Sequence, residues 1–383
     1  MKEQSFADLG VSSAVAGALS RRGIEEPFPV QRLVLGDVLA GRDVLVKSPT
    51  GSGKTLAFGI GLVERIEAGD PAPAALVLAP TRELASQIVR ELSGVAQARK
   101  LRVTAVYGGV GLVAQATRAA ASHVLVATPG RLEDLLQRRA FTLDAVRILV
   151  LDEADRMLDM GFRPAIDRIV KACPAARQTL FFSATLDGVA GKIAAQYTRG
   201  AVRHESSGTP GSSAAAQVEH RFVPVREDGR VDALLIELGR ERDRTLVFVR
   251  TKRGADRLVK RQGADGVQAL AIHGNKSQRQ REQALSRFQA GRVDTLVATD
   301  VAARGIDVEG ISHVINFHPP GDHEAYIHRV GRTGRAGRRG VGITLVGAED
   351  RQEMSRLAGR LGLRQEFGEA AGRESRRSGR TRR

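Results

Sequence analysis

Short apolar runs recur along the chain, and each ends in a cluster of small or polar residues. Each run is too short for a typical helix and is rich in β-branched residues, as strands buried on both faces of a parallel sheet are. Helix-like stretches at 54–67, 82–98 and 131–138 lie between them. This alternation predicts a doubly wound parallel α/β domain. The runs of the first half are DVLVKS (43–48), ALVLAP (75–80), HVLVATP (123–129), ILVLDEAD (148–155) and TLFFSAT (179–185).

The same alternation resumes in the second half after an interruption. Residues 204–216, HESSGTPGSSAAA, are rich in Gly and Ser and have no periodicity, so we expect a flexible linker there. We therefore expect α/β domains at 1–203 and 217–362, and a basic, disordered tail at 363–383. The runs of the second half are TLVFVRT (245–251), VQALAIHG (267–274), TLVATDV (295–301), HVINFHP (313–319) and GITLVGA (342–348).

The charge of the chain indicates what kind of partner it has. A formal net charge of +16 favours a polyanion, either nucleic acid or an acidic membrane surface. No apolar run approaches the roughly 18–20 residues that cross a bilayer, and the first residues lack a signal-peptide core, so nucleic acid is preferred. The single cysteine, Cys173, excludes an internal disulfide and a cysteine zinc cluster, which fits a reducing cytoplasm.

The segment SPTGSGKT (48–55) follows a predicted strand and opens a predicted helix. Such a turn directs backbone N–H groups at phosphates, here from Thr50, Gly51, Ser52 and Gly53. Lys54 is then the residue that reaches the β- and γ-phosphates, and Thr55 is a Mg²⁺ ligand. Ser48 stands where the first glycine of the strict pattern is expected, and the alternative is a plain glycine-rich turn with an exposed lysine.

A nucleotide site of this kind also needs a carboxylate at a neighbouring strand end to hold the metal. Asp152 follows four apolar residues directly, with Glu153 beside it. We assign Asp152 to Mg²⁺, partly through water, and Glu153 to the base that orients the attacking water. The alternative is that Asp152 is an acidic helix cap.

The order of these segments resembles that of the DEAD-box branch of superfamily 2 helicases, in a bacterial, minimal-core form. Residues 152–155 read Asp-Glu-Ala-Asp, and the likeness covers about residues 5–350. It implies two RecA-like domains, ATP and Mg²⁺ as cofactors, and an RNA-dependent ATPase that unwinds RNA. Unwinding, or the remodelling of RNA–protein complexes, is implied to be local and non-processive.

The resemblance assigns further residues to the nucleotide. GIEEPFPVQ (23–31) is similar to the family's Q motif, so Gln31 is implied to read adenine, and Phe6 matches the upstream aromatic that packs on the base. A glutamine offers both a donor and an acceptor to an adenine edge. Gly305 and Asp307 are implied to contact the nucleotide, Asp307 at the ribose.

HRVGRTGRAG (328–337) is implied to carry arginine fingers, Arg332 and Arg335, which stabilise charge on the γ-phosphoryl group. The alternative is a basic RNA-binding turn. The second half has no phosphate loop of its own. One ATP shared by two domains would make domain closure the switch.

The RNA path is expected at other strand ends, where small residues admit the strand and arginines neutralise phosphates. Taken singly, each position is equally well a loop or a helix cap. Aromatic residues make up 4% of the chain, so we expect backbone contacts with little sequence specificity. The implied contacts are Pro80, Thr81, Arg82, Gly108, Gly109, Thr128, Pro129, Gly130, Arg131, Arg250, Thr251, Gln278, Arg281, Thr299 and Arg304.

A final group is implied to couple the domains: Asp155, Ser183, Thr185 and His328. Ser183 and Thr185 are expected to hydrogen-bond to the Asp-Glu-Ala-Asp strand end, although a plain strand-end cap is the alternative.

Three other functions stay open: a DNA translocase of the same superfamily, a non-enzymatic RNA chaperone and an ATP-gated RNA clamp. We expect single-stranded and duplex RNA as partners, no membrane, and a monomer. Ribosomal or degradation-complex proteins are not distinguished as partners. The histidines lack the spacing of a metal site.

Overall fold

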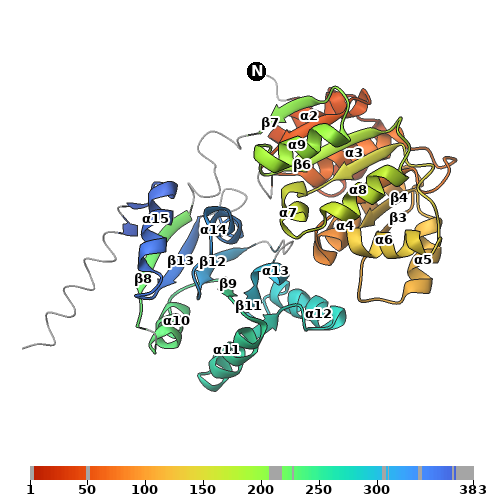
Figure 1. The fold of residues 1–383 in the computed structure, drawn as a ribbon. Helices are drawn as coiled ribbons and strands as arrows, with labels where there is room; N and C mark the ends of the chain where they lie inside the picture. The colour runs from red at the N-terminus through yellow and green to blue at the C-terminus, as the bar shows by residue number, and fades with distance from the viewer. Residues whose placement is uncertain are drawn as a thin grey trace, which may run out of the picture. The chain divides into compact units, whose positions relative to one another are not determined.

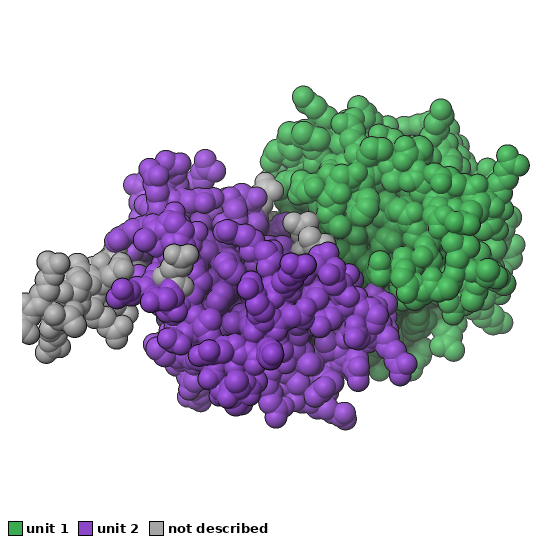
Figure 2. All heavy atoms as spheres, turned by 60° about the horizontal axis from the view of Figure 1, so that its bottom comes forward, with its two compact units in different colours: residues 1–210 green, residues 211–383 purple. Residues whose placement is uncertain are grey.

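The computed structural model describes residues 4–48, 52–206, 218–226, 228–303, 308, 310–334, 339–364 and 366–367. The chain forms two compact units, Met1–Pro210 and Gly211–Arg383, which Figure 2 shows in separate colours. Their division falls inside the segment predicted as linker. Most of that segment, and the predicted tail beyond residue 367, lies outside the described residues, so linker and tail stay predictions.

Unit 1 contains a seven-stranded sheet in the order β3-β4-β2-β5-β6-β1-β7, and all its strand pairs are parallel. Its strands are β1 (Val44–Lys47), β2 (Ala75–Leu78), β3 (Val103–Val106), β4 (Val124–Ala127), β5 (Ile148–Leu151), β6 (Gln178–Ser183) and β7 (Val202–Glu205). Its helices are α1 (Ser13–Ser20), α2 (Pro29–Leu39), α3 (Lys54–Arg65), α4 (Arg82–Ala98), α5 (Leu112–Ala120), α6 (Pro129–Gln137), α7 (Ala154–Asp159), α8 (Arg163–Ala172) and α9 (Gly188–Tyr197).

Both faces of this sheet are covered by helices (Figure 1). Alternate residues of β5 show this clearly: Ile148 and Val150 pack into one core cluster, and Leu149 and Leu151 into another. Side chains alternate across a strand, so a strand between two cores is apolar at most of its positions. The five runs predicted in this half are therefore all strands, and the prediction of a doubly wound α/β domain is confirmed.

Close helix packing holds the middle of α3, the helix that begins within the predicted nucleotide motif. A Cβ on Gly59 would come within 2.1 Å of the Leu92 side chain in α4, and one on Gly61 within 2.1 Å of Val38 in α2. The absence of side chains at these two positions therefore lets three helices approach one another. Residue Lys54 begins the helix that this packing holds.

Unit 2 contains a six-stranded parallel sheet in the order β10-β11-β9-β12-β13-β8. Its strands are β8 (Val218–Pro224), β9 (Arg244–Val249), β10 (Ala269–Ile272), β11 (Thr295–Thr299), β12 (Ile311–Asn316) and β13 (Gly340–Val346). Its helices are α10 (Arg230–Leu238), α11 (Lys252–Ala264), α12 (Gln278–Gln289), α13 (Asp300–Ala303), α14 (His323–Val330) and α15 (Arg351–Leu361). The second predicted α/β domain is thereby confirmed.

Two packed elements extend slightly beyond the ranges predicted for the domains. Strand β7 runs to Glu205 and so extends into the range predicted as linker. At the other end, Phe367 packs edge-on against Phe222, with ring centroids 5.3 Å apart, and joins the core formed by α14, α15 and β8. The packed part of unit 2 thus reaches past residue 362, because two apolar side chains there, Leu363 and Phe367, pack against this core.

Candidate nucleotide and RNA sites

Three predicted nucleotide clusters meet at one edge of the unit 1 sheet. Strands β5, β6 and β1 are neighbours and parallel, so their carboxyl ends lie side by side. Asp152 follows β5, Ala184 follows β6 and Ser48 follows β1. Ser48 extends the β1 pairing, since its N–H donates to the Ser183 carbonyl at 3.0 Å.

The described part of the phosphate loop is held by its own residues. Lys54 is 7% exposed, and its Nζ donates to the Ser48 carbonyl at 3.0 Å. The Ser48 and Ser52 hydroxyls lie 2.6 Å apart. Gly53 has φ +89°, a left-handed conformation that favours glycine, and it is the N-cap of α3. The Lys54 ammonium therefore rests on backbone at the position where phosphate oxygens would compete for it.

Gln31 ties the start of α2 to this loop. Its Nε2 donates to the Gly53 carbonyl at 3.0 Å, its Oε1 accepts from the Phe28 N–H at 2.9 Å, and the residue is fully buried. Each end of the amide keeps one further hydrogen-bonding position, which an adenine edge requires. Gln31 therefore contacts the segment that leads into α3, and its role in reading the base stays a prediction.

The predicted base-packing residue, Phe6, is 3% exposed and lies in the hydrophobic core of unit 1, so its role also stays a prediction. Phe28 lies beside the loop instead: it is 53% exposed and its Cβ is 3.3 Å from the position of a Cβ on Gly53. Phe28 is the N-cap of α2 and cannot accept a hydrogen bond there, so only the Gln31 half of a capping box forms.

Asp152 is 3% exposed and has unusual electrostatics. Burial raises the pKa of Asp152 to about 7, the Lys54 ammonium opposes this rise, and the Glu153 carboxylate adds to it. Its Oδ1 accepts from the Glu153 N–H at 3.0 Å. No described residue forms an ion pair with it. A buried carboxylate with so little compensation would gain from a nearby cation.

Glu153 is held by a residue that sequence reasoning did not single out. Arg156 Nη1 donates to Glu153 Oε2 at 2.8 Å, and the two side chains are 5% and 10% exposed. Glu153 has φ +50°, which is uncommon for a residue with a side chain. The available signal in the sequence was an arginine three residues after Glu153, in a helix whose other buried residues, Ala154 and Met157, are apolar.

Asp155 connects the Asp-Glu-Ala-Asp segment to the end of β6. Its Oδ2 accepts from the Ala184 N–H at 2.9 Å, the Thr185 N–H at 3.0 Å and the Thr185 hydroxyl at 3.3 Å. Its own N–H donates to the Ser183 hydroxyl at 3.4 Å. The hydrogen bonds that we expected from Ser183 and Thr185 are therefore present, and the coupling role stays a prediction.

The predicted RNA residues of unit 1 gather around the loop that follows β3. Arg82 lies against the glycine pair there, since a Cβ on Gly109, at φ +89°, would lie 2.2 Å from Arg82 Nη1. Arg131 Nη1 donates to the Val110 carbonyl at 3.1 Å and to Gln115 Oε1 at 3.2 Å. The remaining members of this set lie at strand and helix ends: Pro80 and Pro129 are buried, Thr81 and Thr128 are the N-caps of α4 and α6, and Gly108 and Gly130 lie in the loop and in α6.

The predicted RNA residues of unit 2 follow β9, end β11 or lie in the first turn of α12. Thr251 caps α11 by accepting from the Gly254 N–H at 3.0 Å. The exposed Arg250 donates its N–H to His318 Nδ1 at 3.2 Å. Burial lowers the pKa of His318 to about 4, so this ring is neutral and able to accept. The other three, Gln278, Arg281 and Thr299, are each 7–8% exposed.

Two arginines of the 328–337 segment of unit 2 have different surroundings. Arg329 forms two bonds to the Asp300 carboxylate, at 2.6 and 2.7 Å, and donates to Asn316 Oδ1 at 3.0 Å. It also lies over the Phe248 ring, 5.0 Å from the centroid, so it anchors α14 to the sheet. Arg332 is 4% exposed and donates from Nε to the His328 carbonyl at 3.3 Å.

Some predicted residues lie outside the described part of the chain: Thr50, Gly51, Arg304, Gly305, Asp307 and Arg335. Within the described ranges, no group of three or more His, Cys, Asp or Glu side chains is arranged to hold a metal. None of the helices there is long and apolar enough to cross a bilayer.

Comparison with known proteins gives matches over both units. The family model for DEAD/DEAH box helicases matches residues 28–192, and that for the helicase conserved C-terminal domain matches residues 229–337. The chain is 41% identical over 347 residues to the ATP-dependent RNA helicase CshA of Limosilactobacillus reuteri, covering 89% of this chain and 69% of that protein. It is 41% identical over 350 residues to the ATP-dependent RNA helicase DbpA of Escherichia coli, covering 90% and 76%.

Solved structures are similar over nearly the whole chain. Dbp5 of S. cerevisiae, bound to RNA and ADP BeF3, has a TM-score of 0.82 at 28% identity and covers 94% of each chain. Mss116p bound to ssRNA and AMP-PNP has a TM-score of 0.84 at 26% identity, covering 94% of this chain and 78% of that one.

Proposed function

The chain belongs to the DEAD-box ATP-dependent RNA helicases, and we propose that it uses ATP bound at the carboxyl edge of unit 1 to separate short RNA duplexes locally. The observation that carries this proposal is the convergence of Lys54, Asp152 and Glu153 at one sheet edge, tied to Ser183 and Thr185 through Asp155.

In this proposal each unit 1 residue has a distinct task at the nucleotide. Gln31 binds the adenine edge with its free donor and acceptor positions. Lys54 exchanges the Ser48 carbonyl for phosphate oxygens, and Gly53 allows the backbone to turn toward them. Glu153, oriented by Arg156, accepts a proton from the attacking water.

The residues present also fit Mg²⁺. Mg²⁺ prefers oxygen ligands and is often held by one or two carboxylates together with substrate phosphates, which suits the single buried carboxylate Asp152 and the hydroxyl of Thr55. Burial raises the pKa of the Asp152 carboxyl, so its charged form would gain from a cation bound beside it. Bound there, the ion would neutralise charge on the phosphates.

RNA is proposed to bind by its backbone along the strand ends of both units. In unit 1, Arg82 and Arg131 brace the 108–111 loop and still carry charge toward a phosphate. Relatives bound to RNA support this path. We propose that closure of the units on ATP and RNA bends one strand, and that Arg332 and Arg335 then reach the γ-phosphate. Arg332 would have to leave its enclosed position for this.

Steady-state ATP hydrolysis tests the proposal. The rate is measured without nucleic acid, with single-stranded RNA and with DNA of the same sequence, for the wild-type chain and for Glu153→Gln. Strong stimulation by RNA alone, lost in Glu153→Gln, is expected. Equal stimulation by DNA would favour a translocase, and hydrolysis that persists in Glu153→Gln would refute the assigned base. A duplex-separation assay distinguishes unwinding from an ATP-gated clamp.

A further inference from the structure

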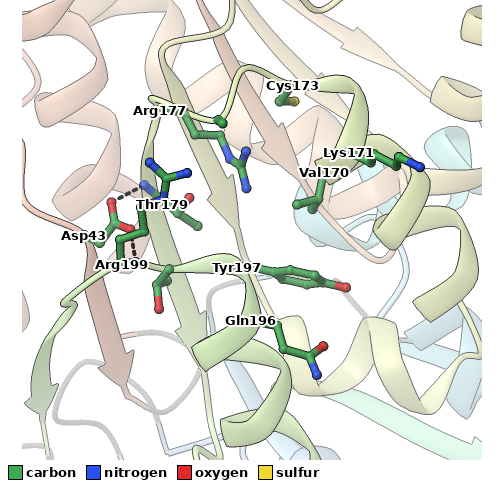
Figure 3. A pocket seen from close by; sticks show the side chains of 11 residues that line it. Asp43, Val170, Lys171, Cys173, Arg177, Thr179, Gln196, Tyr197 and Arg199 are labelled. Atoms are coloured by element: carbon green, nitrogen blue, oxygen red, sulfur yellow. Dashed lines mark hydrogen bonds between the residues drawn. The ribbon is translucent and has the colours of Figure 1, made fainter.

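A cavity of about 300 Å³ opens at the amino-terminal end of the unit 1 sheet (Figure 3). Its walls come from the residues just before β1, β6 and β7 and from the ends of α8 and α9. Ser48, Asp152 and Thr185 follow the carboxyl ends of the same sheet. Because the strands are parallel, the cavity and the nucleotide residues lie at opposite edges of the sheet, so the cavity is separate from the proposed ATP site.

The lining of this cavity is strongly cationic. Lys171, Arg177 and Arg199 contribute to it, and Asp43 is the one carboxylate among its lining residues, so three positive charges and one negative give a net charge of +2. Asp43 does not pair with them. Its Oδ1 accepts from the Thr179 N–H and its Oδ2 from the Arg199 N–H, both at 2.7 Å, as the dashed lines in Figure 3 mark.

The three cations have no carboxylate partner within ion-pair distance in the described part of the chain. The position of Lys171 explains a cation there without any ligand, because Lys171 lies in the last turn of α8, where a positive charge offsets the helix dipole. Arg177 and Arg199 lie outside any helix. The two guanidinium groups therefore carry the inference.

Arg177 has an unmet hydrogen-bonding need. Its Nη1 donates to the Pro174 carbonyl at 2.9 Å, which fixes the side chain, while its Nε is buried and has no acceptor among the described residues. A buried N–H without a partner is costly and uncommon in native structures. Figure 3 shows the Arg177 side chain reaching from the loop before β6 into the space between Thr179 and Val170. An oxygen ligand there would satisfy it.

Two other chemistries do not fit this cavity. Burial raises the pKa of the Cys173 thiol to about 11, so at neutral pH it is protonated and a poor nucleophile. The Tyr197 hydroxyl is already bonded to Asp167, and its pKa is raised by burial, so this residue offers its ring and no charge. What remains is a small, half-open cavity with two arginines and excess positive charge.

We propose that this cavity binds a phosphate group. Arginine guanidinium groups match phosphate oxygens in geometry and charge, and a phosphate carries close to two negative charges at neutral pH, which the lining balances. A volume of about 300 Å³ admits a phosphate or pyrophosphate with little attached to it. The group belongs either to a small phosphorylated molecule or to the end of an RNA strand.

Calorimetric titration with inorganic pyrophosphate, without Mg²⁺, tests this site. The phosphate loop is a second acceptor of pyrophosphate, so the titration uses the full chain with Lys54→Ala. We expect binding that Arg177→Gln weakens at least about tenfold, since it removes charge-assisted bonds. Arg199→Gln should weaken pyrophosphate binding similarly. Because Arg199 is exposed, this second variant is expected to fold even if Arg177→Gln does not. Lys192→Gln, an exposed charge on α9 outside the cavity, is the matched control.

A second titration identifies the source of the phosphate. A short RNA with a 5′-phosphate is compared with the same RNA ending in a 5′-hydroxyl. Tighter binding of the phosphorylated strand that is lost in Arg177→Gln assigns the cavity to RNA ends, and equal binding assigns it to a small phosphorylated molecule. No pyrophosphate binding in the Lys54→Ala chain, or binding that neither arginine substitution changes, overturns the proposal.

Discussion

Replacing Asp152 by asparagine should stabilise the ligand-free protein at alkaline pH. The carboxyl group has an ordinary pKa of 3.8, which burial in the folded state raises to about 7. A shift of about 3 units corresponds to roughly 4 kcal/mol as an upper figure, at about 1.4 kcal/mol per unit. Asparagine keeps the oxygen that accepts from the Glu153 N–H and never carries the buried charge.

The direction of the pH dependence of stability follows from proton binding at Asp152. Between pH 3.8 and about 7 the folded state holds one more proton at Asp152 than the unfolded state, so stability falls as pH rises through this window. The asparagine variant has no such loss. The difference in unfolding free energy between the two proteins should be near zero at pH 4, grow toward pH 7 and level off above pH 8.

Urea denaturation of both proteins at pH 4.5, 6, 7 and 8.5, with chelator and without nucleotide, measures this difference. Asp144→Asn is the control, because Asp144 is exposed and its replacement removes the same formal charge. A stability difference that does not depend on pH, or one that shrinks as pH rises, would refute the assignment of a destabilising buried charge to Asp152. Addition of Mg²⁺ with ATP should then favour the wild-type protein.

Three further substitutions have definite outcomes. Arg156→Gln leaves the Glu153 carboxylate without its guanidinium partner. The kcat for ATP hydrolysis should therefore fall by up to about 100-fold, with a smaller change in KM. Arg156→Lys should restore part of the lost kcat. Arg329→Met should lower the stability of unit 2 by about 3 kcal/mol in urea denaturation, because Asp300 and Asn316 lose their donor. Gly109→Ala strains a residue with left-handed backbone and displaces the Arg82 side chain. The affinity for single-stranded RNA, measured by fluorescence anisotropy, should therefore drop about tenfold. An unchanged affinity contradicts an RNA role for this loop.

The interior strands were predictable because their environment leaves one choice of residue. Each lies between two helical layers, so the central positions of each strand are mostly apolar, and a run such as ILVL can be recognised without the structure. The two edge strands of unit 1 were missed because their residues are less uniformly apolar. β7 alternates half-buried and exposed residues, and the half-buried β3 contains a threonine, so neither forms a continuous apolar run. The edge strand β10 of unit 2 is half-buried to the same extent but was predicted, because all four of its residues are apolar.

The nucleotide residues were predictable from strand ends, but their surroundings were not. Chain order placed Asp152 and Glu153 at a sheet edge, yet nothing in the order of residues says that Arg156 folds back onto Glu153. Nor does it say that Phe6 packs into the core while Phe28 stays exposed beside the phosphate loop. Enclosure depends on what packs around a side chain, and that information comes from distant segments.

The three carboxylates of the Asp-Glu-Ala-Asp segment differ in the hydrogen-bond and ion-pair partners around them. Asp155 accepts from two backbone N–H groups and a hydroxyl, and Glu153 is paired with Arg156, so both have partners within the protein. Asp152 has one backbone donor and a raised pKa. Its charge is the least compensated of the three, so an added cation stabilises it most. This electrostatic difference supports the proposal that Asp152 is the residue nearest the metal.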